Sequence, residues 1–265
     1  MPHIDARLLP VLTDVERGLR ELGVPFGVVG ALVPELLLAD RPAQMTNDAD
    51  VVVAVDSLAD FEALKDRLAS YGFQRTGVAH RLQHRTGGLL DVLPSGTTLA
   101  PEGTLQFEDG VVFTMAGFNH VVPHALLITV EGGPELPVAP LPLYALLKLI
   151  AFGDRKAGKD LGGVLHCLQH YMEEEDRRYG AEFDGQGVPW EYTCAFLLGL
   201  DALPYLDAET TAAVRPVLDG FTGADASMVG LAASQRGRML VTGGQRAEVF
   251  ELFRWYHVGT GLRSR

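Results

Sequence analysis

Three aspartates stand where their carboxylates could bind a divalent metal ion. Asp48 and Asp50 lead into residues 51–55, a run rich in valine that predicts a β-strand. Residues two apart on a strand project to the same face, so both carboxylates point the same way. Asp91 lies in a second apolar segment, residues 88–93. Neighbouring carboxylates repel each other unless a cation lies between them, and oxygen ligands suit a hard ion such as Mg2+. The pattern predicts a site for one or two ions that serves phosphoryl or nucleotidyl transfer.

A simpler interpretation of the two paired aspartates stays open. An Asp-x-Asp at the start of a strand is common, and it often only caps a loop or solvates the strand end. The segment upstream favours the metal site. Residues 26–29 read as a strand, Gly30-Ala31 as a turn, and the residues through Leu38 as a helix with Pro34 in its first turn. Glycine lets the backbone approach a ligand closely, and a helix N-terminus favours phosphates, although a tight turn alone would also explain Gly30.

Further along, a leucine-rich helix carries Lys148, and Arg155 and Lys159-Asp160 follow it. The order of Gly turn, Arg and Thr, Asp-x-Asp, lone Asp and this basic helix resembles the nucleotidyltransferase superfamily, whose fold is that of DNA polymerase β. Within it the chain looks most like the AbiEii-type enzymes of abortive infection and toxin–antitoxin systems. The resemblance covers roughly residues 20–170. Ala31 replaces the usual Gly or Ser, and Gly163 stands where the family has an Asp.

The resemblance implies a nucleoside triphosphate substrate with Mg2+, or alternatively Mn2+. Asp48 and Asp50 would hold the metal, while Asp91 would complete a second metal position and act as base or orient the attacking hydroxyl. All three are therefore predicted to be both catalytic and metal-binding. The residues predicted to bind the nucleotide are Gly30, Ala31, Arg41, Thr46, Lys148, Arg155, Lys159 and Asp160. Lys148 could instead extend along its helix to solvent, and Arg155 and Lys159 could be surface residues.

By resemblance, the chain moves a nucleotide from the triphosphate to an acceptor hydroxyl. In AbiEii-type relatives the acceptor can be RNA, notably a tRNA 3′ end, and an antitoxin protein can restrain the toxic activity. Transfer to a small molecule or to a protein is a second hypothesis. A catalytically silent nucleotide-binding module is a third, to which the substitution at Ala31 points.

Charge and composition limit the partners. The 265 residues carry a net charge of −12, so the chain as a whole lacks the basic footprint typical of nucleic-acid binding. Residues 233–265 are the exception, with six arginines against two glutamates. The two cysteines form no disulfide framework, which favours a cytoplasmic setting. Neither a signal peptide nor a membrane span is expected, because no apolar run is long enough.

The spacing of apolar residues predicts an α+β protein. The resemblance implies a mixed-sheet nucleotidyltransferase core with flanking helices over residues 1–139. The change to helical spacing predicts a helical C-terminal domain over residues 140–265. In the core, helices are expected over residues 5–22 and from Ser57, a capping residue, to about Ser70. Besides the strands already named, strands are expected near residues 73–76, 79–84, 111–115, 125–130 and 136–138.

Overall fold

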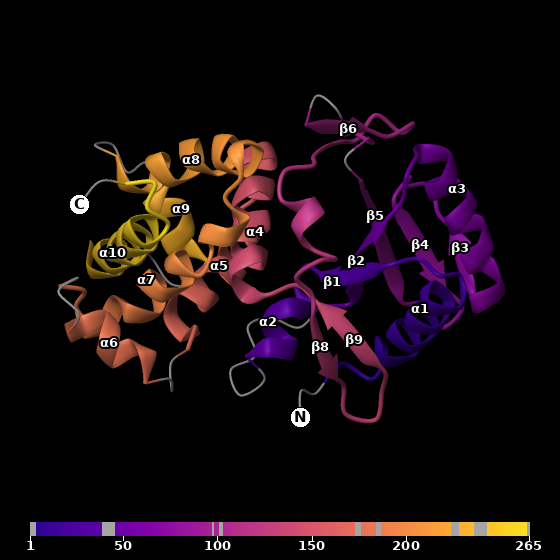
Figure 1. The fold of residues 1–265 in the computed structure, drawn as a ribbon, viewed down its shortest axis with the longest axis horizontal. Coiled ribbons are helices and arrows are strands. Elements are labelled where there is room, and N and C mark those ends of the chain that lie inside the picture. The colour runs from indigo at the N-terminus through magenta and orange to yellow at the C-terminus, as the bar shows by residue number, and fades with distance from the viewer. Residues whose placement is uncertain are drawn as a thin grey trace. The chain divides into compact units, whose positions relative to one another are not determined.

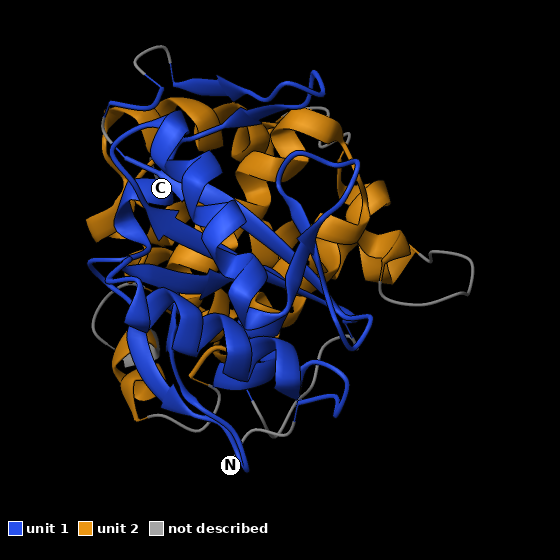
Figure 2. Ribbon diagram, turned by 90° about the vertical axis from the view of Figure 1, so that its right-hand side faces the viewer, with its two compact units in different colours: residues 1–140 blue, residues 141–265 orange. Residues whose placement is uncertain are grey.

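The computed structural model describes residues 4–38, 46–96, 98–100, 103–172, 176–183, 187–223, 228–235 and 243–263. The chain divides into two compact units, residues 1–140 and residues 141–265 (Figures 1 and 2). The division lies one residue from the boundary that the change in composition predicts. Each unit has its own secondary structure and its own apolar core.

The first unit is built on a mixed seven-stranded sheet with the strand order β3-β4-β5-β2-β1-β9-β8. Strands β2 and β5 pair in parallel, as do β1 and β9, and the remaining neighbours are antiparallel. The expectation of an α+β protein with a mixed sheet is confirmed. The strands are β1 (Phe26–Val29), β2 (Asp48–Ala54), β3 (Phe73–Arg75), β4 (Arg81–His84), β5 (Leu89–Ser95), β8 (Leu126–Thr129) and β9 (Glu135–Val138).

Helices α1 (Leu9–Glu21) and α3 (Leu58–Arg67) cover one face of the sheet (Figure 1). Asp14 of α1 bonds His84 of β4, and α3 reaches Arg75 of β3 through Glu62. The central strands are buried because β-branched valines fill both faces of β1 and β2. The predicted cap of α3 is confirmed, since the Ser57 hydroxyl accepts the backbone N–H of Asp60 at 3.1 Å.

Three details differ from the expected elements. Helix α2 (Leu32–Leu37) has only six residues. Strand β2 begins at Asp48, three residues before the valine run of residues 51–55 that predicted it, so both aspartates lie within the strand. The strand expected near residues 111–115 is β7 (Val112–Thr114), and it pairs in a separate two-stranded hairpin with β6 (Thr104–Gln106), which was not expected.

Helices and their connecting loops make up the second unit, with no strand among its described residues. Its tightest packing is between α7 and α10, where Gly199 and Gly259 let the two backbones touch, because a Cβ on either would meet the other's Cα at 3.1 Å. None of the described helices in either unit is long and apolar enough to cross a membrane. The helices are α4 (Leu141–Arg155), α5 (Lys159–His170), α6 (Arg177–Phe183), α7 (Thr193–Leu200), α8 (Ala208–Thr222), α9 (Val229–Ser234) and α10 (Gly243–Gly259).

Candidate functional site

Strand pairing brings Asp48, Asp50 and Asp91 to one face of the sheet; these three residues are called the carboxylate cluster. Asp50 of β2 lies directly beside Asp91 of β5 in the parallel register. Paired residues of neighbouring strands share a face, and Asp48 shares it as well because it lies two residues before Asp50. This is the face opposite to the one that α1 covers, since Leu90, the neighbour of Asp91, is paired with Leu82 on the helix side.

The Gly30 turn touches the carboxylate cluster. Gly30 follows β1, whose last residue, Val29, pairs with Asp50. Its φ is +73°, in the left-handed region, and a Cβ placed there would lie 1.9 Å from Oδ2 of Asp50. Two separate reasons therefore require glycine at position 30: the left-handed backbone conformation, and the space that the carboxylate of Asp50 occupies.

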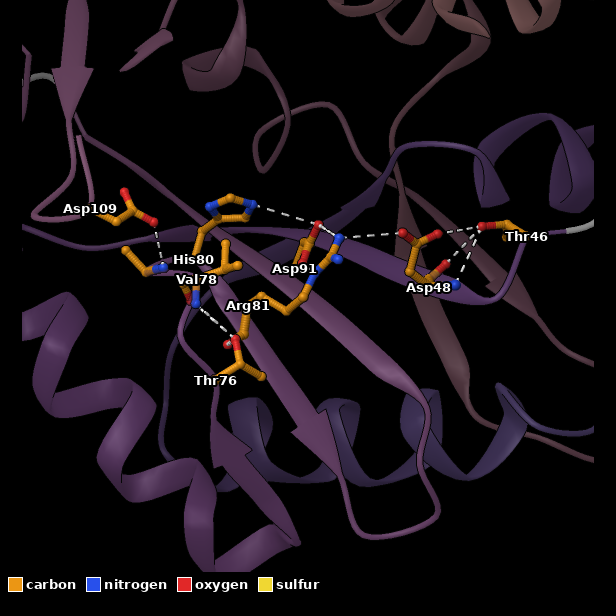
Figure 3. Close-up of polar contacts among 9 residues, drawn as sticks. Thr46, Asp48, Thr76, Val78, His80, Arg81, Asp91 and Asp109 are labelled. Atoms are coloured by element: carbon orange, nitrogen blue, oxygen red, sulfur yellow. Dashed lines mark hydrogen bonds and ion pairs between the residues drawn. The ribbon is translucent and has the colours of Figure 1, made fainter. Parts of the chain in front are cut away.

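Arg81 of β4 reaches into the carboxylate cluster (Figure 3). Its Nε and Nη2 donate to Oδ1 and Oδ2 of Asp91, both at 2.7 Å, and Nη2 lies 3.6 Å from Oδ2 of Asp48. The hydrogen bonds with Asp91 raise the pKa of Arg81 above its usual value. His84 of the same strand points to the other face, where it is buried against Asp14.

The segment that carries Arg81 is held on several sides. The backbone N–H of Ala79 donates to Asp109 of the β6–β7 hairpin at 2.9 Å, and its carbonyl accepts Nζ of Lys65 at 2.6 Å. The hydroxyl of Thr76 bonds the carbonyl of Arg81 at 3.0 Å. These contacts, several of which are drawn in Figure 3, fix the backbone from which the guanidinium extends.

His80 lies beside the carboxylate cluster, with Nε2 at 3.8 Å from Oδ2 of Asp91. Its ring packs edge-on against Phe113 and at a tilt against Phe107, both near the β6–β7 hairpin. Burial among these rings lowers the pKa of His80, which favours the neutral imidazole. The fixed positive charge beside the cluster is therefore that of Arg81, and His80 contributes a ring packed among aromatic side chains.

Three further residues predicted to bind the nucleotide are Thr46, Ala31 and Arg41, and they differ in where they lie. Thr46 contacts the carboxylate cluster directly, since its hydroxyl donates to Oδ1 of Asp48 at 2.6 Å. Ala31 follows Gly30 and occupies the N-cap position of α2. Arg41 lies outside the described residues. The short α2 supplies a weaker dipole than the expected helix, so any phosphate contact here would depend on backbone N–H groups.

The chemistry of the carboxylate cluster suits a hard divalent ion, since its three side chains are carboxylates on one face. The arrangement is not a closed metal cage. Within the described residues, no group of three or more His, Cys, Asp or Glu side chains is arranged to hold an ion. Asp91 in particular has both oxygens engaged by Arg81. Asp48 and Asp50 are thus the residues that fit a metal ion in this arrangement.

The other predicted nucleotide-binding residues belong to the second unit. Asp160 of α5 is buried, and both of its oxygens accept hydrogen bonds from Arg155 of α4, at 2.6 and 2.8 Å. Nζ of Lys148 lies 3.6 Å from the same carboxylate. Lys159 is exposed at the start of α5. Asp160 therefore positions Arg155 and Lys148, while the binding of nucleotide by these residues stays a prediction.

Arg81 is the residue of this site that the sequence interpretation missed as a partner of Asp91. The signal was present, because β4 and β5 form a hairpin and oppositely charged residues face each other across it. Finding the pair requires the register of the hairpin, which Gly87 sets at a turn with φ of +89°.

The chain was compared with family models, with curated proteins and with solved structures. No protein-family model matches this chain, and no curated protein matches it. The chain is similar to an antigenic nucleotidyltransferase-like protein from Paracoccidioides brasiliensis, with 14% sequence identity, a TM-score of 0.42, and coverage of 88% of this chain and 94% of that one. At that identity and score the likeness assigns no activity to this chain.

Proposed function

We propose that this chain is a metal-dependent nucleotidyltransferase that moves a nucleotide from a nucleoside triphosphate to an acceptor hydroxyl. The observation that carries the proposal is the contact between the Gly30 turn and the carboxylate cluster. An Asp-x-Asp pair, a lone Asp on the neighbouring strand and a glycine turn against the central carboxylate meet at one face of a sheet. Carboxylate oxygens beside the half-buried backbone of the Gly30 turn suit a metal–triphosphate complex.

Asp48 and Asp50 would hold Mg2+, or Mn2+ as the alternative, and the bound ion would neutralise charge on the phosphates. The Thr46 hydroxyl fixes one oxygen of Asp48 and so orients that ligand. The backbone of Gly30 and Ala31 would contact the terminal phosphates. Asp91, held by Arg81, would orient the acceptor hydroxyl for in-line attack on the α-phosphorus, with pyrophosphate as the leaving group.

Among nucleotidyltransferases, the order of motifs favours the AbiEii type, with an RNA acceptor such as a tRNA 3′ end and an antitoxin protein as partner. A small-molecule or protein acceptor is the alternative, and the net charge of −12 favours it because phosphate backbones bind basic surfaces. One assay separates these acceptors. The chain is incubated with Mg2+, each α-labelled nucleoside triphosphate and total RNA, and label is sought in RNA, in protein and in small molecules.

The proposal predicts that Asp48→Ala and Asp50→Ala each abolish labelling while leaving the fold intact. Mutation of residues that bind a catalytic metal typically lowers the rate by several orders of magnitude, whereas both side chains lie at a solvent-accessible strand end. The matched control is Asp66→Ala on α3, an exposed carboxylate that pairs with Arg75. Rates are compared after circular dichroism has established equal folding.

Wild-type activity in either cluster variant would contradict the proposed site. A wild-type chain that labels no acceptor with any nucleotide, but binds nucleoside triphosphate, would instead indicate a silent binding module.

A further inference from the structure

Arg81 places a fixed positive charge inside the carboxylate cluster. Its guanidinium holds both oxygens of Asp91 and lies within 3.6 Å of Asp48, so it stands between the two carboxylates. Paired arginine and carboxylate groups of this geometry form the strongest side-chain hydrogen bonds. A divalent ion bridging Asp91 and Asp48 would need this space and would be repelled by the guanidinium.

The position of Arg81 is built into the sheet. Its backbone lies in register with Asp91 across the β4–β5 hairpin, and Thr76 bonds its carbonyl. The preceding residues are held by Asp109 and Lys65. The side chain of Asp91 is only 11% exposed and that of Arg81 only 31% exposed, so the pair is partly shielded from solvent. Because the pair is partly buried, removing the guanidinium of Arg81 would leave the carboxylate of Asp91 without a compensating positive charge, which costs free energy.

We infer that Arg81 takes the place of a second metal ion, so that the carboxylate cluster binds one divalent ion, at Asp48 and Asp50. Asp91 is then a positioned hydrogen-bonding group rather than a metal ligand, with Arg81 as its positioning residue. The inference rests on the proposed function and narrows it, because the three carboxylates alone would allow one ion or two. It follows from the occupied oxygens of Asp91 and from the charge beside Asp48.

Mn2+ binding to the whole chain tests the inference without any assay of activity. Free Mn2+ is measured by electron paramagnetic resonance during titration, and ions bound per chain are counted. Wild type is expected to bind about one ion, and Arg81→Gln about two, because the variant frees Asp91 and removes the repelling charge. Adding Asp91→Asn to Arg81→Gln is expected to return the count to about one.

Two further variants make the result independent of how well Arg81→Gln folds. Asp91→Asn alone is expected to keep one ion with an affinity within about threefold of wild type, because Asp91 is not a ligand. Arg75→Gln is the matched control. Arg75 lies on β3, the strand next to β4, and it also pairs with carboxylates, those of Glu62 and Asp66. Its register partner is Leu82, so it lies on the face opposite to the carboxylate cluster. This control is expected to bind one ion, like wild type.

Two ions in wild type, one ion in a folded Arg81→Gln, or loss of the ion in Asp91→Asn would each overturn the role of Arg81. If Asp48→Asn abolishes binding while Arg81→Gln still takes one ion, the proposed metal site stands and only the inference about Arg81 fails. No bound Mn2+ in wild type and in Arg81→Gln would overturn the metal site and this inference together.

Discussion

At the scale of single residues, Gly30 couples the turn to the carboxylate cluster. A left-handed φ of +73° alone would make glycine favourable, as it does at Gly23, where φ is +68°. The two positions differ in their surroundings, because a Cβ at Gly30 would collide with Asp50, whereas a Cβ at Gly23 would meet nothing within 4 Å. The chain therefore contains its own control for separating backbone strain from contact with the site.

Gly30→Ala is expected to lower the free energy of unfolding by about 3 kcal/mol, from left-handed strain plus displacement of the Asp50 carboxylate. Gly23→Ala is expected to lower it by about 1 kcal/mol, from the strain alone. Urea denaturation measures both. Gly30→Ala is also expected to weaken Mn2+ binding, which Gly23→Ala leaves unchanged. Equal destabilisation and unchanged binding in both variants would contradict the close contact between Gly30 and Asp50.

At the scale of elements, helix α2 carries a partly buried ionisable side chain, Glu35. Oε1 of Glu35 is buried with no hydrogen-bond partner among the described residues. Burial, assisted by the negative charge of Asp5, raises the pKa of Glu35 from 4.5 to about 7. The folded chain therefore binds this proton more tightly than the unfolded chain does. Stability from this group is fully present below pH 4.5 and is lost as the pH rises through about 7.

Glu35→Gln is expected to remove this loss, because the amide stays neutral. Relative to wild type, the variant gains on the order of 1 kcal/mol at pH 8 and little at pH 4.5, a value reduced for the partial exposure of the side chain. Urea denaturation across this pH range measures the difference. Glu108→Gln, at an exposed glutamate between β6 and β7, is the control. A difference between Glu35→Gln and wild type that is independent of pH would contradict the raised pKa.

At the scale of the whole molecule, the carboxylate cluster and the two cysteines lie in different units. The carboxylate cluster belongs to the first unit, and both cysteines, Cys167 and Cys194, are buried in the second with no disulfide between them. Burial raises the pKa of Cys167 above its ordinary value, which suppresses the reactive thiolate.

A thiol reagent such as dithionitrobenzoate is therefore expected to react with neither cysteine in the native chain and with both in guanidinium chloride. Absorbance of the released thiolate counts the groups. If the thiols react while circular dichroism shows the chain to be fully folded, the burial of the two cysteines in the helical unit would be contradicted. Fewer than two thiols in the denatured chain would contradict the absence of a disulfide between them.

The sequence by itself determined the local features of this protein. Alternation and β-branched residues indicated the strands of Asp50 and Asp91, the Gly30 turn between strand and helix, and the change near residue 140 from sheet to helices. These features depend on residues a few positions apart, so periodicity and turn chemistry are enough to find them. The same local rules placed Asp48 and Asp50 on one face.

Only the tertiary structure decided what the carboxylates contact. The parallel register of β2 and β5 sets Asp91 beside Asp50, the β4–β5 hairpin brings Arg81 onto Asp91, and the approach of β1 to β2 places Gly30 against Asp50. Each of these contacts joins segments that are remote in the chain or depends on a strand register. A shift of one residue would turn every side chain of a strand to the other face, so no local pattern could fix them.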